Sequence, residues 1–256
     1  MAGEKSSVGS HLRSLNPCAH DTPLKLWIAI PTNMHPTAND LPALTHLLRD
    51  IATADILSRF RDADPRAKAD GSLVTEADLA VQQGIERNLA ERYPGIPLLG
   101  EEMTSAQQQA LIAQGDSTFW CLDPLDGTSN YACGFPGFCI SLALIQQGQS
   151  TLALVYDPVR DECFTAARST GAWLNDQPIQ PFTPGQRLGD CIAMMDLKRL
   201  PPERIPTLFA PGNFRSQRNL GAVALEWCWL AAGRFQLYLH GGQKLWDYAA
   251  GRLIAT

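Results

Sequence analysis

The sequence predicts a layered fold in which helices and an antiparallel sheet come first and a smaller α/β part follows. Apolar residues recur at helical spacing between Pro42 and Tyr93, and short apolar runs separated by turns follow up to residue 167. From residue 192 onward, strand-like and helix-like segments alternate, which is typical of an α/β layer. We expect a poorly ordered tail over residues 1–40, helices with an antiparallel sheet over residues 41–183, and an α/β domain over residues 184–256.

Two helices are expected to begin the ordered part. The first starts at Pro42, and its apolar residues fall on one face at a spacing of 3.6. The second covers residues 76–93 and is ended by Pro94 and Gly95. The apolar face of the first helix is made by Leu44, Leu47, Leu48, Ile51, Ala54 and Leu57.

Strands are expected at short runs rich in apolar residues, of which residues 96–99 and 119–122 suit buried strands. A turn at Gln147-Gly148 joins two of them into a hairpin. A largely apolar helix over residues 221–233 and a last helix from Trp246 complete the prediction. The expected strands are residues 96–99, 119–122, 138–145, 151–156, 162–167, 192–195 and 235–239.

Composition restricts the classes of function. The 256 residues are 45% hydrophobic and 18% charged, which is ordinary for a globular chain and unlike a disordered one. Lys and Arg number 21 and Asp and Glu number 26, so the formal net charge is −5. We expect no nucleic-acid partner, because general nucleic-acid binding requires a basic face. A phosphorylated substrate then requires a local source of positive charge.

The sequence also indicates a compartment. No segment approaches the roughly eighteen apolar residues of a membrane span, so no membrane partner is expected. The apolar stretch over residues 24–30 is short and ends at Pro31, unlike a secretory signal. Seven cysteines form an odd number without a C-x-x-C pair, which argues against a disulfide framework or a zinc ribbon. We expect a cytoplasmic protein with reduced thiols.

Acidic residues stand at the ends of expected strands or at the beginning of a helix. Glu101 and Glu102 follow the strand over residues 96–99. Asp123 and Asp126 follow the next strand, and Asp247 opens the last helix. Ligands usually bind at strand ends in such folds. Oxygen ligands from several segments, without His or Cys, suit Mg²⁺ or Mn²⁺ better than zinc.

The segment DPLDGT, residues 123–128, carries the sharpest signal. Pro124 fixes φ and Gly127 permits a tight turn, so both aspartates and the Leu125 carbonyl can face one point. A helix is expected to begin at Thr128, where backbone N–H groups and the helix dipole favour an anion. Together with bound metal ions, this helix start would supply the missing positive charge.

Turns and helix caps offer a plainer explanation for each acid taken alone. Asp-Pro and Asp-Gly are common turn dipeptides. Asp247 fits an acid in the first turn of a helix, and Asp78 fits a capping box with Thr75. Three independent acids at strand ends are hard to explain by caps, which favours the metal site.

Together these motifs resemble the inositol monophosphatase family, within the wider lithium-sensitive, magnesium-dependent phosphatase superfamily. The resemblance covers residues 42–256 and implies an αβαβα layered sandwich. It also implies hydrolysis of a small phosphate monoester by metal-activated water. The matching motifs are LVTEAD (73–78), GEE (100–102), DPLDGTSNY (123–131) and WDYAAG (246–251).

The resemblance implies two principal metal positions. Glu101, Asp123 and the Leu125 carbonyl would hold one Mg²⁺. Asp123, Asp126 and Asp247 would hold a second, with Asp123 bridging the two ions. Mn²⁺ is the alternative ion.

The resemblance also implies catalytic roles for Glu101, Thr128 and Asp78. Thr128 and Glu101 would orient and deprotonate the attacking water. Asp78 would act through water at a third, weaker magnesium position that also involves Glu101. The substrate would be bound by Asp126 and by the backbone groups of Gly127 and Thr128.

The sequence departs from the family pattern in two places. His240 stands where animal members of the family have a glutamate that contacts inositol hydroxyls. We expect it to contact a different alcohol or a second phosphate, or to be a loop residue. The chain ends at Thr256, nine residues after Asp247, so we expect the α/β domain to be truncated. Lys68 matches a basic position near the site, or is a solvated lysine.

The expected function is magnesium-dependent hydrolysis of inositol 1-phosphate or a similar phosphorylated alcohol. A phosphatase for 3′-phosphoadenosine 5′-phosphate is an alternative, because the segment KADGS at residues 68–72 also resembles that branch. An inactive remnant that acts as a binding protein is the alternative from another class. The resemblance implies a homodimer, for which the residues give no independent signal.

Overall fold

The computed structural model describes residues 35–68, 71–113 and 117–256. Residues 33–256 form one compact unit. Of the tail expected over residues 1–40, residues 1–34 lie outside the described residues. Within its last part, Thr37 caps a short 3₁₀ turn, Ala38–Asp40, which leads directly into the first helix.

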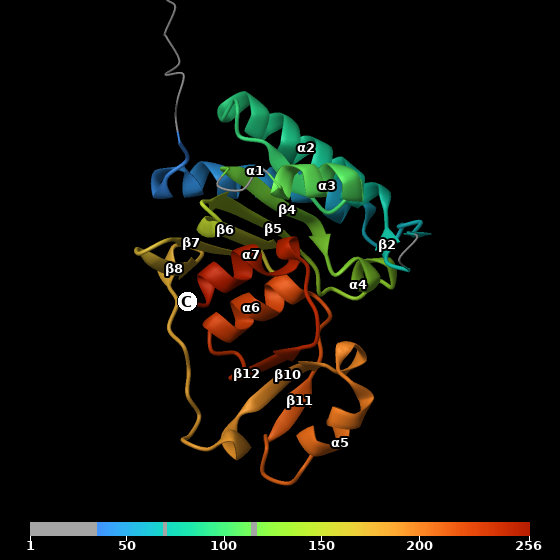
Figure 1. The fold of residues 1–256 in the computed structure, drawn as a ribbon, viewed down its shortest axis with the longest axis vertical. Coiled ribbons are helices and arrows are strands. Elements are labelled where there is room, and N and C mark those ends of the chain that lie inside the picture. Colours follow the sequence, from blue (N-terminus) through green and yellow to red (C-terminus); the bar gives the residue numbers. More distant parts are fainter. Residues whose placement is uncertain (1–34, 69–70, 114–116) are drawn as a thin grey trace, which may run out of the picture. The chain divides into compact units, whose positions relative to one another are not determined.

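A mixed sheet of seven strands forms the centre of this unit (Figure 1). Its strands lie in sequence order, β3 pairs with β4 in parallel, and every later pair is antiparallel. The strands are β3 (Leu98–Gly100), β4 (Phe119–Asp126), β5 (Cys139–Gln146), β6 (Gln149–Asp157), β7 (Glu162–Ala167), β8 (Gly171–Leu174) and β9 (Gln177–Pro178).

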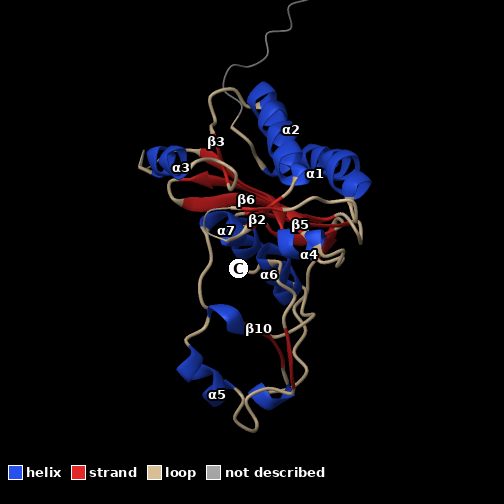
Figure 2. Ribbon diagram, turned by 90° about the vertical axis from the view of Figure 1, so that its right-hand side faces the viewer, coloured by secondary structure: helices blue, strands red, loops and turns tan. Residues whose placement is uncertain are grey.

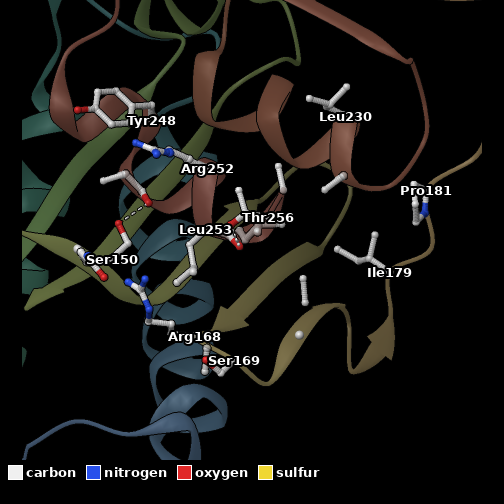
Figure 3. A pocket seen from close by; sticks show the side chains of 18 of the residues that line it. Ser150, Arg168, Ser169, Ile179, Pro181, Leu230, Tyr248, Arg252, Leu253 and Thr256 are labelled. Atoms are coloured by element: carbon white, nitrogen blue, oxygen red, sulfur yellow. Dashed lines mark hydrogen bonds between the residues drawn. The ribbon is translucent and has the colours of Figure 1, made fainter.

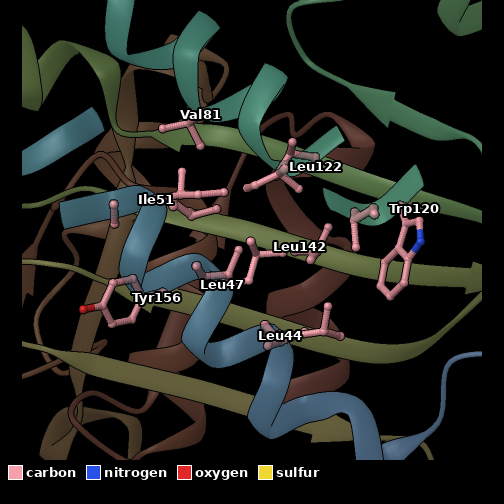
Figure 4. Close-up of a cluster of buried hydrophobic side chains, with 14 of the residues drawn as sticks. Leu44, Leu47, Ile51, Val81, Trp120, Leu122, Leu142 and Tyr156 are labelled. Atoms are coloured by element: carbon pink, nitrogen blue, oxygen red, sulfur yellow. The ribbon is translucent and has the colours of Figure 1, made fainter. Parts of the chain in front are cut away.

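Helices α1 (Leu41–Ile51) and α2 (Glu76–Arg92) cover one face of the sheet. Pro42 occupies the first turn of α1, where its missing N–H is not needed. Figure 4 shows Leu44, Leu47 and Ile51 of α1 against Leu142 of the sheet. The predicted apolar stripe is confirmed for Leu44, Leu47, Leu48 and Ile51, which are buried. It is wrong for Ala54 and Leu57, which are exposed, because α1 ends at Ile51 and a π-helix over Ala52–Ile56 buries Ala52 and Ile56 instead.

The opposite face packs against α6 (Val223–Ala231) and α7 (Leu245–Ile254). Along β5, Leu142 and Leu144 lie in the cluster with α1, whereas Ala143 and Ile145 lie in the cluster with α6 and α7. Because β5 is buried on both faces, its sequence is mainly apolar, with Ser141 as a buried polar exception.

A smaller parallel sheet lies beyond α6 and α7 (Figure 2). Its order is β11 (Ser216–Arg218), β10 (Ile192–Asp196) and β12 (Leu237–His240), and the short helix α5 (Ile205–Leu208) follows β10. Helices, large sheet, helices and small sheet thus succeed one another as layers, as predicted. The parts expected over residues 41–183 and 184–256 pack together within the one compact unit.

Four further short elements lie near the ends of these layers. They are the antiparallel pair β1 (Arg66–Ala67) and β2 (Leu73–Val74), and the helices α3 (Ser105–Ile112) and α4 (Thr128–Ala132).

The structure also bears on two sequence expectations. The six cysteines that it describes are all free. Within the described ranges, no helix has the length and apolar character needed to cross a membrane.

Candidate active site

The end of β4 carries two acids of the candidate site. β4 reaches Asp126, but its pairing with β5 shifts between Asp123 and Asp126. Such an irregularity re-aims side chains at the end of a strand. The backbone N–H of Leu125 donates to Oδ1 of Asp123 at 3.1 Å, which fixes that carboxylate beside the shift.

Gly127 turns the chain from β4 into α4. Its φ is 90°, a left-handed conformation that favours glycine, and a Cβ there would lie 2.7 Å from the carbonyl oxygen of Gly137. The hydroxyl of Thr128 lies 3.2 Å from Oδ1 of Asp78 and 2.9 Å from the Leu125 carbonyl, and can donate to either. Thr128 is therefore held between the end of β4 and the start of α2.

Asp78 belongs to the cap of helix α2 and also to the candidate site. Its Oδ2 accepts hydrogen bonds from the backbone N–H and the hydroxyl of Thr75, at 2.7 and 2.6 Å. The predicted capping box is therefore confirmed. Burial raises the pKa of Asp78, the bonds from Thr75 oppose this, and the nearby charge of Glu101 adds to it.

Asp123 and Asp126 are buried, with 2% and 7% of their surfaces exposed. Oδ2 of Asp126 accepts from the backbone N–H of Ala224, in the first turn of α6, at 2.6 Å. Burial is the largest cause that raises the pKa of Asp123 well above its ordinary value. Neighbouring carboxylates raise it further, namely Glu101, Asp126, Asp247 and Asp78. Acids from β4, α2, α7 and the turn after β3 therefore lie within electrostatic reach of one another.

Lys68 is the cation that faces these acids. Its Nζ lies 2.7 Å from Oε1 of Glu101 and 2.7 Å from Oε1 of Glu102. Burial lowers the pKa of Lys68, but both carboxylates raise it, and the result is a pKa above its ordinary value. The Glu101 backbone N–H donates to the Leu122 carbonyl at 3.1 Å, which sets Glu101 beside β4. Lys68 is thus an ion-pair partner of the site rather than a solvated lysine.

Asp247 approaches from the start of α7. Its Oδ2 accepts from the backbone N–H of Lys244 at 2.7 Å, as expected for an acid in the first turn. Burial raises the pKa of Asp247 to about 6, against the bond from Lys244. Ser141 of β5 donates its hydroxyl to the Trp246 carbonyl at 3.2 Å and so ties this turn to the large sheet.

His240, the last residue of β12, lies in a buried contact with Asp196. Only 2% of its side chain is exposed, and its Nε2 lies 3.2 Å from Oδ2 of Asp196. Its Nδ1 accepts from the backbone N–H of Gly242 at 3.2 Å. Burial lowers the pKa of His240, and Asp196 opposes this shift. Nε2 makes no hydrogen bond to any described residue, although it is buried beside Asp196. Because so little of the side chain is exposed, a direct contact with substrate gains no support from this position.

The donor chemistry of the site fits a hard divalent cation. All candidate ligands are oxygens, and the carboxylates are buried near one another. Yet within the described ranges no group of three or more His, Cys, Asp or Glu side chains is arranged to hold a metal ion. Glu101 is bonded to Lys68, and Asp126 and Asp247 are bonded to backbone N–H groups. A cation must therefore compete with Lys68 for Glu101.

A large cavity of about 1310 Å³ lies apart from these acids, beside α7 (Figure 3). Its walls include Ile179, Leu230 and Leu253, and Ser150 there donates to the Ala249 carbonyl at 2.8 Å. None of the residues predicted for the site lines this cavity.

Two further residues join α4 to the region before α6. The Asn130 side chain donates to the carbonyls of Gly137 and Leu220, at 2.6 and 2.8 Å. Glu226 accepts from the backbone N–H groups of Leu220 and Gly221, at 3.0 and 2.9 Å. Sequence reasoning assigned neither residue a role. The one available signal for Glu226 was a carboxylate in a helix expected to be apolar.

Comparison with known proteins adds to this geometry. The model of the inositol monophosphatase family matches residues 41–256. Inositol monophosphatase 1 of Solanum lycopersicum is 35% identical over 196 residues, which are 73% of this chain and 70% of that protein. The Nus factor SuhB of Xylella fastidiosa is 34% identical over 189 residues. This match covers 70% of the chain but only 64% of that relative.

Solved structures agree with the sequence matches. Staphylococcal inositol monophosphatase-1, in a complex soaked with LiCl, superposes with a TM-score of 0.76 at 27% identity. The superposition covers 87% of this chain and 82% of that one. The layered fold of this chain is shared with these phosphatases. The chain belongs to the inositol monophosphatase family.

Proposed function

We propose that the chain hydrolyses a small phosphate monoester with Mg²⁺, with inositol 1-phosphate as the first candidate. The single observation that carries this proposal is the gathering of buried carboxylates from β4 and α2 and a half-buried one from α7 beside Glu101. Two related structures support the substrate and the ion. A dual-specific IMPase/NADP phosphatase is bound with D-inositol-1-phosphate, and an IMPase/NADP phosphatase is complexed with Mg²⁺ and phosphate.

Five residues would hold two principal ions, and Asp78 would act through water at a weaker third. When bound, Mg²⁺ supplies activation of the attacking water and stabilisation of the leaving oxygen. In the metal-free protein, Lys68 neutralises part of this negative charge. The proposed ligands are Glu101, Asp123, the Leu125 carbonyl, Asp126 and Asp247.

The protein groups would position the water and accept its proton. Thr128 can donate its own proton to Asp78 or to the Leu125 carbonyl, which leaves lone pairs on its oxygen to accept a hydrogen bond from the water. Glu101 would then take the proton from that water. The backbone groups of Gly127 and Thr128, with Asp126, would bind the substrate.

A nucleotide phosphate is the second candidate substrate. An IMPase/NADP phosphatase complexed with NADP and Ca²⁺ superposes with a TM-score of 0.76 at 28% identity. That relative acts on a nucleotide phosphate according to its name, which favours a test of 3′-phosphoadenosine 5′-phosphate here.

A binding role without catalysis is the candidate from another class. Relatives from Xylella fastidiosa and Pasteurella multocida are named Nus factor SuhB.

We further propose a cytoplasmic location, which the free state of the described cysteines supports. A homodimer remains a prediction, which light scattering on the purified protein checks.

A phosphate-release assay tests the proposed function. Inositol 1-phosphate, 3′-phosphoadenosine 5′-phosphate and sugar phosphates are each incubated with Mg²⁺, without metal, and with added Li⁺. We expect release that requires Mg²⁺ and is inhibited by Li⁺. Absence of release from every ester would refute the catalytic proposal and favour the binding role.

A further inference from the structure

Three polar residues meet where two parallel strands of the small sheet end. We call Asp196, Arg199 and His240 the Asp196 cluster. Asp196 and His240 are register partners and the last residues of β10 and β12. In sheets of parallel strands, ligands usually bind beyond the carboxyl ends. The cluster therefore stands where a ligand is expected.

The members of the cluster differ in exposure. Oδ2 of Asp196 accepts from Nη1 of Arg199 at 2.6 Å and lies 3.2 Å from Nε2 of His240. The side chains of Asp196 and His240 are 9% and 2% exposed, whereas that of Arg199 is 56% exposed. Asp196 and His240 are thus a buried support, and Arg199 is the member that solvent and ligands can reach.

The cluster lies close to the proposed active site. Gly241 packs so tightly on the loop after β10 that a Cβ there would collide with the Arg199 carbonyl. The chain then continues from Gly241 into α7, where Asp247 lies in the first turn. Arg199 therefore lies on the segment that packs against the connection between β12 and the first turn of α7, where Asp247 is a proposed metal ligand.

Charge decides what this arginine can recognise. A guanidinium presents a planar fork of N–H donors that matches a phosphate or carboxylate. Hydrogen bonds to a charged group contribute more than those to a neutral hydroxyl. The protein carries a net charge of −5, and its acids repel a substrate that bears extra negative charge. Such a substrate needs a cation beside the acids, and Arg199 is placed to provide one.

We propose that Arg199 is a specificity-determining residue that binds a second anionic group of the substrate. This proposal rests on the proposed phosphatase function and narrows its substrate class. The favoured substrate is a phosphate ester whose alcohol carries another phosphate or a carboxylate. Asp196 and His240 are positioning residues that hold the guanidinium.

Two pairs of substrates separate the anionic group from the rest of the molecule. Inositol 1-phosphate is compared with inositol 1,4-bisphosphate, which adds a phosphate. Glycerol 3-phosphate is compared with 3-phosphoglycerate, which replaces a hydroxymethyl group by a carboxylate. kcat and KM are measured for each with Mg²⁺. We expect the wild-type protein to prefer one or both anionic members, and the pair that shows the preference identifies the recognised group.

Arg199→Gln is the decisive variant. We expect KM for the preferred anionic ester to rise by about 10–100-fold, with kcat nearly unchanged. KM for the paired ester without the second anionic group should change little. Arg199→Lys should recover part of the preference, and His240→Gln should weaken it. Arg204→Gln is the matched control, because Arg204 is an exposed arginine on the same segment after β10.

A binding measurement keeps this proposal distinct from the proposed function. Calorimetric titration of inositol 1,4-bisphosphate in the presence of Ca²⁺ compares the wild-type protein with Arg199→Gln. Arg199-dependent binding, together with no phosphate release from any ester in the assays with Mg²⁺, would support the inference and refute the phosphatase proposal. Phosphate release with equal KM values in both proteins would leave the phosphatase proposal standing and overturn the role of Arg199.

Discussion

The hydroxyl of Thr128 lies 3.2 Å from Oδ1 of Asp78, although 50 residues separate them in the sequence. The other oxygen of Asp78 is already bonded to Thr75 at the start of α2. One carboxylate thus connects the first turn of α2 to the first residue of α4. Through this contact, the orientation of the Thr128 hydroxyl depends on a helix cap.

Thr128→Ala should therefore reduce kcat much more than Thr128→Ser. The serine keeps a hydroxyl that can donate to Asp78, whereas alanine removes it. We expect a loss of about 10²-fold or more for alanine, because the attacking water would no longer be oriented toward Glu101. Steady-state phosphate release checks this. Equal losses in the two variants would show that the hydroxyl is not used.

Gly127→Ala should be much more destabilising than Gly95→Ala. Both glycines have φ near 90°, so both substitutions carry the cost of a left-handed alanine, about 1–2 kcal/mol. Only at Gly127 would the new Cβ also meet a backbone oxygen, that of Gly137 at 2.7 Å; Gly95 has nothing within 4 Å. Urea denaturation measures the difference. Equal free energies of unfolding would contradict the close approach at Gly127.

Lys68→Met should destabilise the metal-free protein, and added Mg²⁺ should restore part of the loss. The substitution leaves Glu101 and Glu102 without their shared ammonium group. Because these side chains are partly exposed, we expect about 1–3 kcal/mol, less than for a fully buried pair. Thermal denaturation with and without Mg²⁺ measures this, with Lys198→Met as an exposed control. A loss that Mg²⁺ does not reduce would argue against an ion bound at Glu101.

Glu226→Gln should change how stability depends on pH. Burial is the main cause that raises the folded-state pKa of Glu226 above its ordinary value of 4.5. The folded state then binds this proton more tightly than the unfolded state. The contribution of protonated Glu226 to the free energy of unfolding is complete below pH 4.5, and it is lost as pH rises through the folded-state pKa.

The glutamine keeps an oxygen for the two backbone N–H groups and does not titrate. Its free energy of unfolding should therefore rise relative to the wild-type protein between pH 4 and pH 7, as measured by urea denaturation. Glu203→Gln, an exposed control, should follow the wild-type profile. Parallel profiles for Glu226→Gln and the wild-type protein would contradict the raised pKa.

Strong periodicity made much of the fold predictable. The helix expected from Pro42 is α1, and the run over residues 162–167 coincides with β7. Helix α3 was not predicted, because among its residues only Leu111 is buried and no apolar stripe exists. Its signal was the capping box between Thr104 and Gln107.

The site was predictable in part for a different reason. The acids lie in local motifs at strand ends, and those motifs can be seen in one sequence. The contacts of Lys68 with Glu101 and of Arg199 with the β12 loop join distant segments. No local pattern encodes such contacts, so the structure was needed to find them.

Asp123→Asn tests the central claim most directly, with Asp64→Asn as an exposed control. Asparagine preserves the shape of Asp123 but removes the carboxylate proposed to bridge two ions. We expect activity to fall by more than the roughly 10–100-fold that loss of an outer-shell partner of a metal site costs. The metal-free variant should remain folded and at least as stable, because a buried charge among other acids is gone. Phosphate release within a few-fold of the wild-type rate at saturating Mg²⁺ would contradict a two-ion site at Asp123.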